Sequence, residues 1–422
     1  MMFLVFYVAI FVAAFMAYRA IESRREHHDF TSLKTVTFGD ESAVTANRFA
    51  SVVSVVTIFI LWGAFTGSKL VPIHMPAHFL GETEFTYTAR SATGETDDAT
   101  VFVVVQPLAE QAEKPSLEGR EGDGFAKNDA VRVKEWTSEI VGAKRNDEGY
   151  REDGYAITHV NGQEIAPEGS VSVDNGTVRM SAKGSLFFQP YQGWQMSPIY
   201  LPAPEAVWAR LIEISSDGYR NFTLFEHLGS SLWRVLLGFA LGSLVGIPLG
   251  YAMGLSNWFR GWFDPIVEFM RPVPPLALIP LIIIWFGIWE TGKISLLFLA
   301  ALWIMTIAAR AGVSGVKISK VHAAYSLGAS KWQVLTKVIV PNSLPEIFTG
   351  ARVAMGVCWG TVVAAELVAA EKGGGMMIIV ASKFQLTDIV IMGIILIGLI
   401  GYGIDILMRY AENWLVPWKG KG

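Results

Sequence analysis

The sequence predicts an all-α polytopic membrane protein with an inserted β-rich external domain. Hydrophobic residues make up 52% of the 422 residues and charged residues only 17%, below the roughly 25% charge of soluble domains. Apolar stretches of nearly 20 residues, the length that crosses a bilayer, recur along the chain. An acidic segment at 81–190, with 20 acidic and 11 basic residues, interrupts them. These observations predict a membrane core carrying a separate polar module.

Seven apolar stretches are the predicted spans. They cover about residues 2–18, 50–68, 229–253, 273–289, 294–313, 350–370 and 388–408. The first precedes Arg19, Arg24 and Arg25, whereas a signal peptide carries its positive charges before its apolar core. It is therefore predicted to be a retained extra N-terminal span, and the other six form a six-helix core.

The distribution of basic residues orients these spans. Because cytoplasmic loops are enriched in Lys and Arg, we expect the N-terminus outside and the C-terminus inside. The predicted domains are an anchor with a cytoplasmic linker at 1–49, the first core span at 50–80, the external insert at 81–197, and the remaining core at 198–422 with a cytoplasmic loop at 314–349.

The insert at 81–197 is predicted to be rich in β-strands. Runs such as TVFVVV, VSVDNGTVRM and GSLFF contain β-branched and aromatic residues between turn residues. The single cysteine, Cys358, excludes an intramolecular disulfide. The insert contains no cluster of metal ligands and no paired catalytic residues. Two interpretations stay open, a plain β-sandwich or sheet module and a docking surface for an external partner.

The third span carries glycine at every fourth position, which permits close helix packing. The stripe consists of Gly238, Gly242, Gly246, Gly250 and Gly254. Four residues exceed one 3.6-residue turn by about 40°, so the stripe should wrap around the helix and contact more than one neighbour. Pro248 inside it predicts a kink. Static packing and a moving hinge are both compatible with this pattern.

Proline is concentrated at the start of the fourth span, in Arg271-Pro272-Val273-Pro274-Pro275, and Pro280 lies one turn further on. Proline suits a helix start, but Pro280 should loosen the backbone at membrane depth. Broken backbone is tolerated there when it is buried or lines a water-filled cavity. Pro280 is therefore a candidate for the wall of a substrate pathway.

The cytoplasmic loop is predicted to form two short helices joined at a turn. The first covers about 318–327 and ends at Gly328, which suits a left-handed cap. Ser330 can cap a second helix from 331 to 340, which Pro341 should end. The pair is amphipathic and can lie on a lipid surface. A rigid elbow that projects small residues fits docking into another protein better.

This loop resembles the segment by which permeases of ATP-binding-cassette importers engage their ATPase subunits. The family pattern is Glu-Ala-Ala, three residues, Gly-Ala, and a proline about a dozen residues later. The matching positions are His322, Ala323, Ala324, Gly328, Ala329 and Pro341. The resemblance implies that the coupling residues are His322, Ala323, Ala324, Leu327, Gly328, Ala329 and Ser330. His322 stands where the family has glutamate, which puts one polar contact of the family in question.

The resemblance extends over about 199–422, and 50–80 matches the family's first span. FDPIVEFMRPVPPLALIPLIIIWFGI, LPEIFTGARVAMGVCWGTVVAAELVAA and LVPWKGK are similar to taurine permeases of the nitrate, sulfonate and taurine group. The resemblance implies a bacterial inner-membrane importer with two permease copies, two ATPase subunits that hold ATP and Mg²⁺, and a periplasmic solute-binding protein. It assigns no role to the anchor or the insert, and the transported anion, taurine or another sulfonate or nitrate, stays open.

Ionisable and polar residues within the spans are candidates for the pathway. Glu366 can gate the pathway or orient a polar network, although its charge would repel an anion. Arg352 lies fourteen residues earlier, about 21 Å along a helix, too far to pair with it. Trp359 and Thr361 are the other candidate ligands, and each can instead pack. Free N–H groups at a broken helix end can also bind a sulfonate.

The chain contains no G-x-x-x-x-G-K-[ST] loop, so it should not hydrolyse ATP itself. It shows no basic footprint for nucleic acid and needs no cofactor of its own. A membrane receptor with a periplasmic sensory domain is a second class, but there is no cytoplasmic output domain. An ion-coupled transporter is a third, and the predicted elbow disfavours it.

Overall fold

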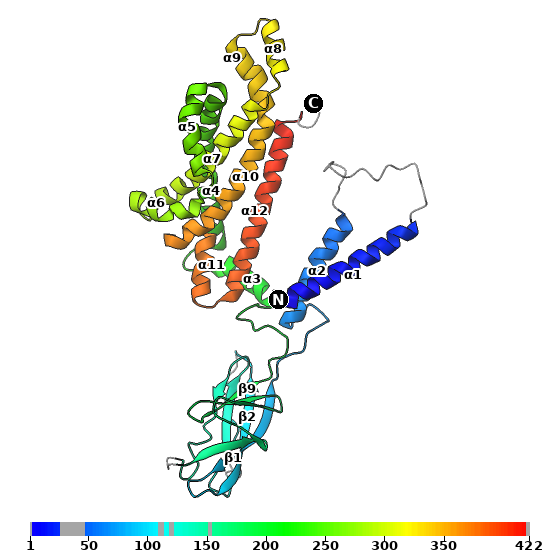
Figure 1. The fold of residues 1–422 in the computed structure, drawn as a ribbon, viewed down its shortest axis with the longest axis vertical. Helices are drawn as coiled ribbons and strands as arrows, with labels where there is room; N and C mark the ends of the chain where they lie inside the picture. Colours follow the sequence, from blue (N-terminus) through cyan, green and yellow to red (C-terminus); the bar gives the residue numbers. More distant parts are fainter. Residues whose placement is uncertain (1, 26–46, 109–113, 118–121, 151–153, 419–422) are drawn as a thin grey trace. The chain divides into compact units, whose positions relative to one another are not determined.

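The computed structural model describes residues 2–25, 47–108, 114–117, 122–150 and 154–418. These residues form two compact units, Met1–Glu205 and Ala206–Gly422, each described below by itself (Figure 1). The predicted cytoplasmic linker before residue 47 lies largely outside the described residues.

The first unit begins with two apolar helices, α1 (Met2–Arg25) and α2 (Arg48–Thr66). Both are long and apolar enough to cross a membrane. Asn47 caps α2 by accepting from the amides of Phe49 and Ala50. The two helices touch where the Tyr7 hydroxyl lies 2.7 Å from the Ser54 hydroxyl. That α1 crosses the bilayer as an extra span stays a prediction.

In the described residues of the first unit, nine strands form two sheets. One sheet has the order β3-β2-β1-β5-β6 and the other the order β4-β9-β8-β7. All neighbours are antiparallel except β2 and β3, which are parallel. The strands are β1 (Gly81–Arg90), β2 (Thr96–Gln106), β3 (Asp129–Lys134), β4 (Glu139–Ile140), β5 (Ala156–Val160), β6 (Gln163–Glu164), β7 (Ser170–Val173), β8 (Gly176–Met180) and β9 (Leu186–Pro190). The predicted β-rich insert is confirmed.

The two sheets share one hydrophobic core. Inward residues alternate along β1 and β2, as a half-buried strand requires. Phe85 of β1 stacks on Phe188 of β9 across the core, with ring centroids 5.9 Å apart. The module is therefore a β-sandwich, as the first interpretation of the insert expected.

One polar cluster is enclosed beside this core. The Tyr87 hydroxyl lies within hydrogen-bond distance of Asp147 Oδ1 (3.0 Å), Asp129 Oδ2 (3.4 Å) and the Ala143 carbonyl (2.9 Å). Tyr155 also donates to Asp147. Burial, together with the charge of Asp147, raises the pKa of Asp129 to about 6, and burial raises the pKa of Asp147. Two carboxyl groups are thus packed together without a cationic partner in this cluster.

The second unit is helical. Its elements are α3 (Pro204–Asp217), α4 (Leu224–Leu255), α5 (Asn257–Met270), the 3₁₀ turn η2 (Pro275–Leu278), α6 (Ile279–Phe286), α7 (Glu290–Ser314), α8 (Ile318–Ser326), α9 (Lys331–Val334), the π-helical turn η3 (Leu335–Ile339), α10 (Val340–Ala369), α11 (Gly374–Lys383) and α12 (Thr387–Leu415). Counting both units, six described helices are long enough to cross a membrane, or seven if a bent pair counts as one span.

The predicted fourth span at 273–289 is not one straight helix. Residues 275–286 are helical in two short pieces, and α5 meets them at a 94° bend across residues 271–274. Pro280 lies at the first turn of α6, where its missing N–H removes no helical bond. The loosening expected at Pro280 corresponds to the change from the 3₁₀ turn η2 to α6 directly before it, and a larger bend lies at residues 271–274, which contain Pro272 and Pro274.

The glycine stripe contacts one neighbour along its whole length, which corrects the expectation of several. A Cβ added at Gly238 would lie 2.4 Å from Leu297 Cβ, and one at Gly250 would lie 2.4 Å from the Thr306 carbonyl oxygen. Gly242, Gly246 and Gly254 meet α7 in the same way. Successive glycines of α4 contact successive turns of α7. Helix α7 therefore crosses α4 at an angle that keeps it against the stripe as the stripe shifts around α4.

Pro341 does not end the second helix of the cytoplasmic loop. The chain stays helical from Lys331 to Leu367, and Pro341 lies in the first turn of α10. The π-helical turn η3 precedes it, and such turns shift the hydrogen-bond ladder by one residue. The π-helical turn tolerates the missing amide hydrogen of Pro341, which is why the helix continues.

Candidate functional site

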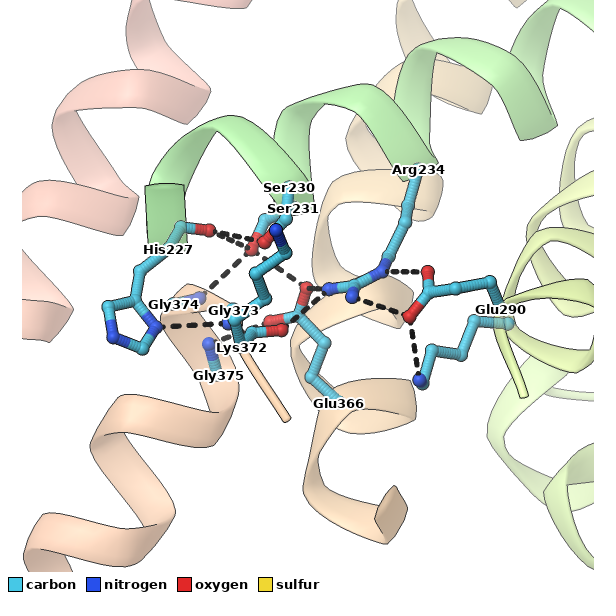
Figure 2. A network of polar contacts seen from close by, with 11 residues as sticks. His227, Ser230, Ser231, Arg234, Glu290, Glu366, Lys372, Gly373, Gly374 and Gly375 are labelled. Atoms are coloured by element: carbon cyan, nitrogen blue, oxygen red, sulfur yellow. Dashed lines mark hydrogen bonds and ion pairs between the residues drawn. The ribbon is translucent and has the colours of Figure 1, made fainter. Parts of the chain in front are cut away.

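A buried network of charges joins α4, α7 and α10 (Figure 2). Arg234 of α4 donates to Glu366 of α10 at 2.6 Å and to both carboxylate oxygens of Glu290, the first residue of α7, at 2.6 and 2.7 Å. Arg234 is 2% exposed and Glu366 1% exposed. Four of the five guanidinium N–H groups bond within the network, since the carbonyl of Lys372 accepts another at 3.0 Å.

The second half of the network holds the start of α11. The amide of Gly375 donates to Glu366 Oε2 at 2.9 Å, and the amide of Gly374 donates to the Ser231 hydroxyl at 2.9 Å. The Ser231 hydroxyl in turn lies 2.8 Å from Glu366 Oε1. These amides at the first turn of α11 favour the negative charge of Glu366. The carboxylate is therefore satisfied on both oxygens.

His227 fixes the loop that leads into α11. Its Nδ1 accepts from the amide of Gly373 at 3.1 Å and its Nε2 lies 3.0 Å from the carbonyl of Tyr219. One ring nitrogen accepts and the other donates, which defines a neutral tautomer. Gly373 adopts φ +148°, and a Cβ there would lie 2.4 Å from the Glu366 carboxylate. Only glycine lets the loop approach Glu366 so closely.

The predicted pathway residues do not converge on one site. Trp359 donates through Nε1 to the carbonyl of Ile397 at 3.1 Å, and Thr361 donates to the carbonyl of Val357 at 2.7 Å. Both are buried in helix packing, and Pro280 is exposed in α6. Glu366 alone belongs to a polar network, as one interpretation expected. Substrate contact by these residues stays a hypothesis.

Sequence reasoning did not identify the partner of Glu366. Arg352, already judged too distant, lies 3.2 Å from Asp405 instead. The real partner, Arg234, lies five residues inside the third predicted span, and Glu366 lies four residues before the end of the sixth. The rule that marks ionisable residues within spans applies to both. Comparing their depths would have paired them, whereas the roles of His227, Ser231 and Gly373–Gly375 had no such signal.

The predicted elbow exists, and we define it as residues 318–334. α8 ends at Ser326, Leu327 is its C-cap, and Gly328 takes φ +81°. Ser330 caps α9 with a complete capping box, because its hydroxyl accepts from the Gln333 amide and the Gln333 side chain accepts from the Ser330 amide. Figure 1 shows α8 and α9 standing beyond the ends of the long helices. The local sequence is therefore sufficient to specify a rigid turn between α8 and α9.

The elbow exposes apolar side chains. Leu327 is 89% exposed and Trp332 is 70% exposed, and no residue of α8 is buried. The residues predicted to couple to an ATPase lie along this segment, in the order His322, Ala323, Ala324, Leu327, Gly328, Ala329 and Ser330. A Cβ added at Gly328 would meet nothing within 4 Å, so glycine is favoured here by its positive φ and not by a lack of space. A rigid, apolar projection of this kind fits a partner's cleft.

Within the described ranges, no group of three or more His, Cys, Asp or Glu side chains is placed to hold a metal ion. The contacts at the network are ion pairs and hydrogen bonds, and the elbow exposes apolar side chains.

Comparison with known proteins gives a consistent result. Residues 242–416 match the family described as binding-protein-dependent transport system inner membrane component. The chain is 47% identical to the taurine transport system permease protein TauC of Escherichia coli, over 54% of this chain and 82% of that protein. It is 32% identical to the bicarbonate transport system permease protein CmpB of Synechococcus elongatus, over 46% of this chain and 70% of that protein.

Proposed function

Since the chain belongs to the family of inner membrane components of binding-protein-dependent transport systems, we propose that it imports taurine or a related sulfonate as the permease subunit of an ATP-driven transporter. The single observation that carries the substrate choice is the 47% identity to a taurine permease. The geometry that supports the transport role is the exposed elbow at one end of α7 and the buried network at the other.

The elbow is the proposed docking site for a separate ATPase subunit, which would hold the ATP and Mg²⁺. Leu327 and Trp332 supply apolar anchors, and the Gly328 turn holds the two helices at a fixed angle. Movement of the ATPase would be transmitted through α9, η3 and α10, since the chain is helical without interruption from Lys331 to Leu367. The Glu366 end of α10 would then move relative to α4.

The proposed assembly contains two copies of this chain, two ATPase subunits and a periplasmic solute-binding protein. The proposed orientation has the N-terminus in the periplasm and the C-terminus in the cytoplasm, with α1 as an extra span. Lysines 317, 320, 331 and 337 around the elbow support its cytoplasmic location. The β-sandwich would then be periplasmic, at the side where a binding protein arrives.

Reconstitution tests this function. The permease, its ATPase and candidate binding proteins are assembled in liposomes, and ATP hydrolysis is measured with each binding protein loaded with taurine, an alkanesulfonate, nitrate or bicarbonate. We expect taurine-loaded protein to stimulate hydrolysis and taurine to accumulate inside. Stimulation by nitrate or bicarbonate but not by taurine would overturn the substrate choice. Uptake that continues without ATP and stops when ion gradients collapse would overturn the transporter class.

A further inference from the structure

A cavity of about 660 Å³ opens beside the buried network, between the first turns of α4, the start of α7 and the loop before α11. We propose that it binds a small zwitterion with an oxyacid anion at one end and a primary ammonium at the other, as an aminosulfonate has. This inference rests on the proposed function, and it places a substrate site in the permease itself.

The charges around the cavity balance. Three cations line it, Arg234, Lys293 and Lys372, and so do three carboxylates, Glu226, Glu290 and Glu371. A simple anion entering this cavity would meet attraction and repulsion of similar size. A zwitterion can place each end against the opposite charge. The balance therefore favours a zwitterion over nitrate, bicarbonate or a plain alkanesulfonate.

Two of the cations have donors to offer an anionic group. Arg234 is committed to Glu290, Glu366 and the Lys372 carbonyl. The ammonium of Lys293 has three N–H groups and, within the described part of the chain, makes one hydrogen bond, to Glu290 at 3.0 Å. Lys293 is 8% exposed, so its remaining donors depend on whatever occupies the cavity.

Lys372 is the second donor. Its ammonium lies 5.3 Å from the centre of the Phe222 ring, and no described carboxylate lies within ion-pair distance of it. Its backbone carbonyl, in contrast, belongs to the buried network. Because Lys372 also lines the cavity, its side chain is available to a ligand there, while its carbonyl stays bonded to Arg234. Lys293 and Lys372 together would hold the sulfonate by charge-assisted hydrogen bonds.

The other end of the ligand meets carboxylate and indole. Glu371 is exposed and makes no hydrogen bond or ion pair with the described residues. The side chains of Trp233 and Trp289 line the same cavity and are both mostly exposed. An indole face attracts a cation more strongly than other aromatic rings. These groups suit a primary ammonium on a short chain.

The size of the cavity fits a transit site. Ligand pockets measure roughly 300–1,000 Å³, and a two-carbon aminosulfonate fills only part of 660 Å³. Water can occupy the rest and complete the ligand's hydrogen bonds. A loosely filled site binds weakly and releases readily, which a molecule on its way through a membrane requires.

Direct binding tests the inference without a binding protein. Radiolabelled taurine is titrated into the purified permease–ATPase complex in lipid nanodiscs, with ethanesulfonate as a competitor that lacks the ammonium. We expect saturable binding, with ethanesulfonate at least about tenfold weaker, because one charge-assisted hydrogen bond contributes about 1.5–3 kcal/mol. Glu371→Gln should remove most of this preference. Lys372→Met should weaken both ligands, and Lys383→Met, an exposed lysine on α11, should change neither.

The failure of this inference is distinct from failure of the proposed function. Wild-type complex that transports taurine but shows no direct binding, or Lys372→Met and Glu371→Gln variants with unchanged affinity and preference, would overturn the cavity assignment alone. Wild-type complex that imports no sulfonate would overturn the proposed function. Size-exclusion profiles of the variants confirm that an altered affinity does not come from a misassembled complex.

Discussion

The buried network around Glu366 and the elbow of α8 and α9 lie at opposite ends of α7, and they differ in the exposure of their side chains. In the network Arg234 and Glu366 are buried while Glu290 stays exposed, and Arg234 makes four hydrogen bonds to three residues. In the elbow apolar side chains face outward and Leu327 is 89% exposed. The first region holds four helical segments together, and the second leaves its apolar side chains uncovered within the described chain.

This contrast predicts that the network determines the stability of the fold and that the elbow determines coupling to a partner. Breaking the network leaves a buried charge without its partner, so it should cost folding free energy. Changing the elbow should leave the fold intact and affect only the assembly. The α4–α7 interface, packed through the glycine stripe, lies between the two regions.

The largest effect is expected from Arg234→Met. Removing one partner of a buried ion pair costs about 3–5 kcal/mol, because the remaining carboxylate of Glu366 is stranded. We expect a large fall in the unfolding midpoint in detergent. Arg409→Met is the matched control, because its ion pair with Asp405 is exposed and such pairs contribute about 0–1 kcal/mol. Equal effects of the two variants would contradict the assigned role of the network.

A smaller loss is expected from Gly250→Ala. The added Cβ would lie 2.4 Å from the backbone carbonyl of Thr306, which cannot move aside as a side chain can. Overpacking of this kind costs about 1–3 kcal/mol. Gly229→Ala, also in α4 but with nothing within 4 Å, should be neutral or stabilising because alanine favours helices. Thermal unfolding of both variants decides whether close packing fixes α4 on α7.

Leu327→Asp should leave the unfolding midpoint unchanged, since the side chain contacts little within this chain. If Leu327 is an anchor of the partner interface, the substitution should weaken ATPase binding by about 2 kcal/mol, roughly 30-fold. Co-purification and ATP-dependent uptake measure this. A destabilised fold with normal ATPase binding would reverse the contrast between the two regions.

The smallest effect concerns the β-sandwich, where Asp129 is buried without the arginine that Glu366 has. Its folded pKa of about 6 exceeds the value of roughly 3.9 in an unfolded chain, so folding favours the protonated form. This stabilisation is fully present below about pH 4 and is lost as pH rises through about 6.

Hydrogen exchange of β1 to β3 in the full-length protein measures this dependence. Protection in the wild type should fall relative to Asp129→Asn between pH 5 and 7, because asparagine stays neutral. A constant difference across this range would show that Asp129 does not titrate there.

Sequence predicted the elbow closely because its determinants are local. Gly328 and Ser330 act on residues within one helical turn, so the end of α8 and the capping box of α9 follow from neighbouring residues. The wrong prediction at Pro341 has a local cause too. Proline was expected to end the helix, but the preceding π-helical turn accommodates it.

The network could not be predicted as closely, because its contacts are far apart in the chain. Arg234 meets Glu366 across 132 positions and Glu290 across 56. The glycine stripe predicted close packing, but the identity of the helix packed against it depended on how α7 crosses α4. Sequence periodicity describes one helix at a time, and the angle between two helices follows from packing.

Cross-linking tests the central claim, that the elbow couples this permease to an ATPase. The only native cysteine, Cys358, is buried, so Leu327→Cys introduces one accessible thiol. We expect a cross-link from this thiol to the ATPase subunit, with a yield that changes when ATP binds. Cysteine at the exposed Ser382 of α11 should give none. Transport that persists while the ATPase neither cross-links to position 327 nor binds the wild-type chain would show that the elbow does not couple this permease to an ATPase.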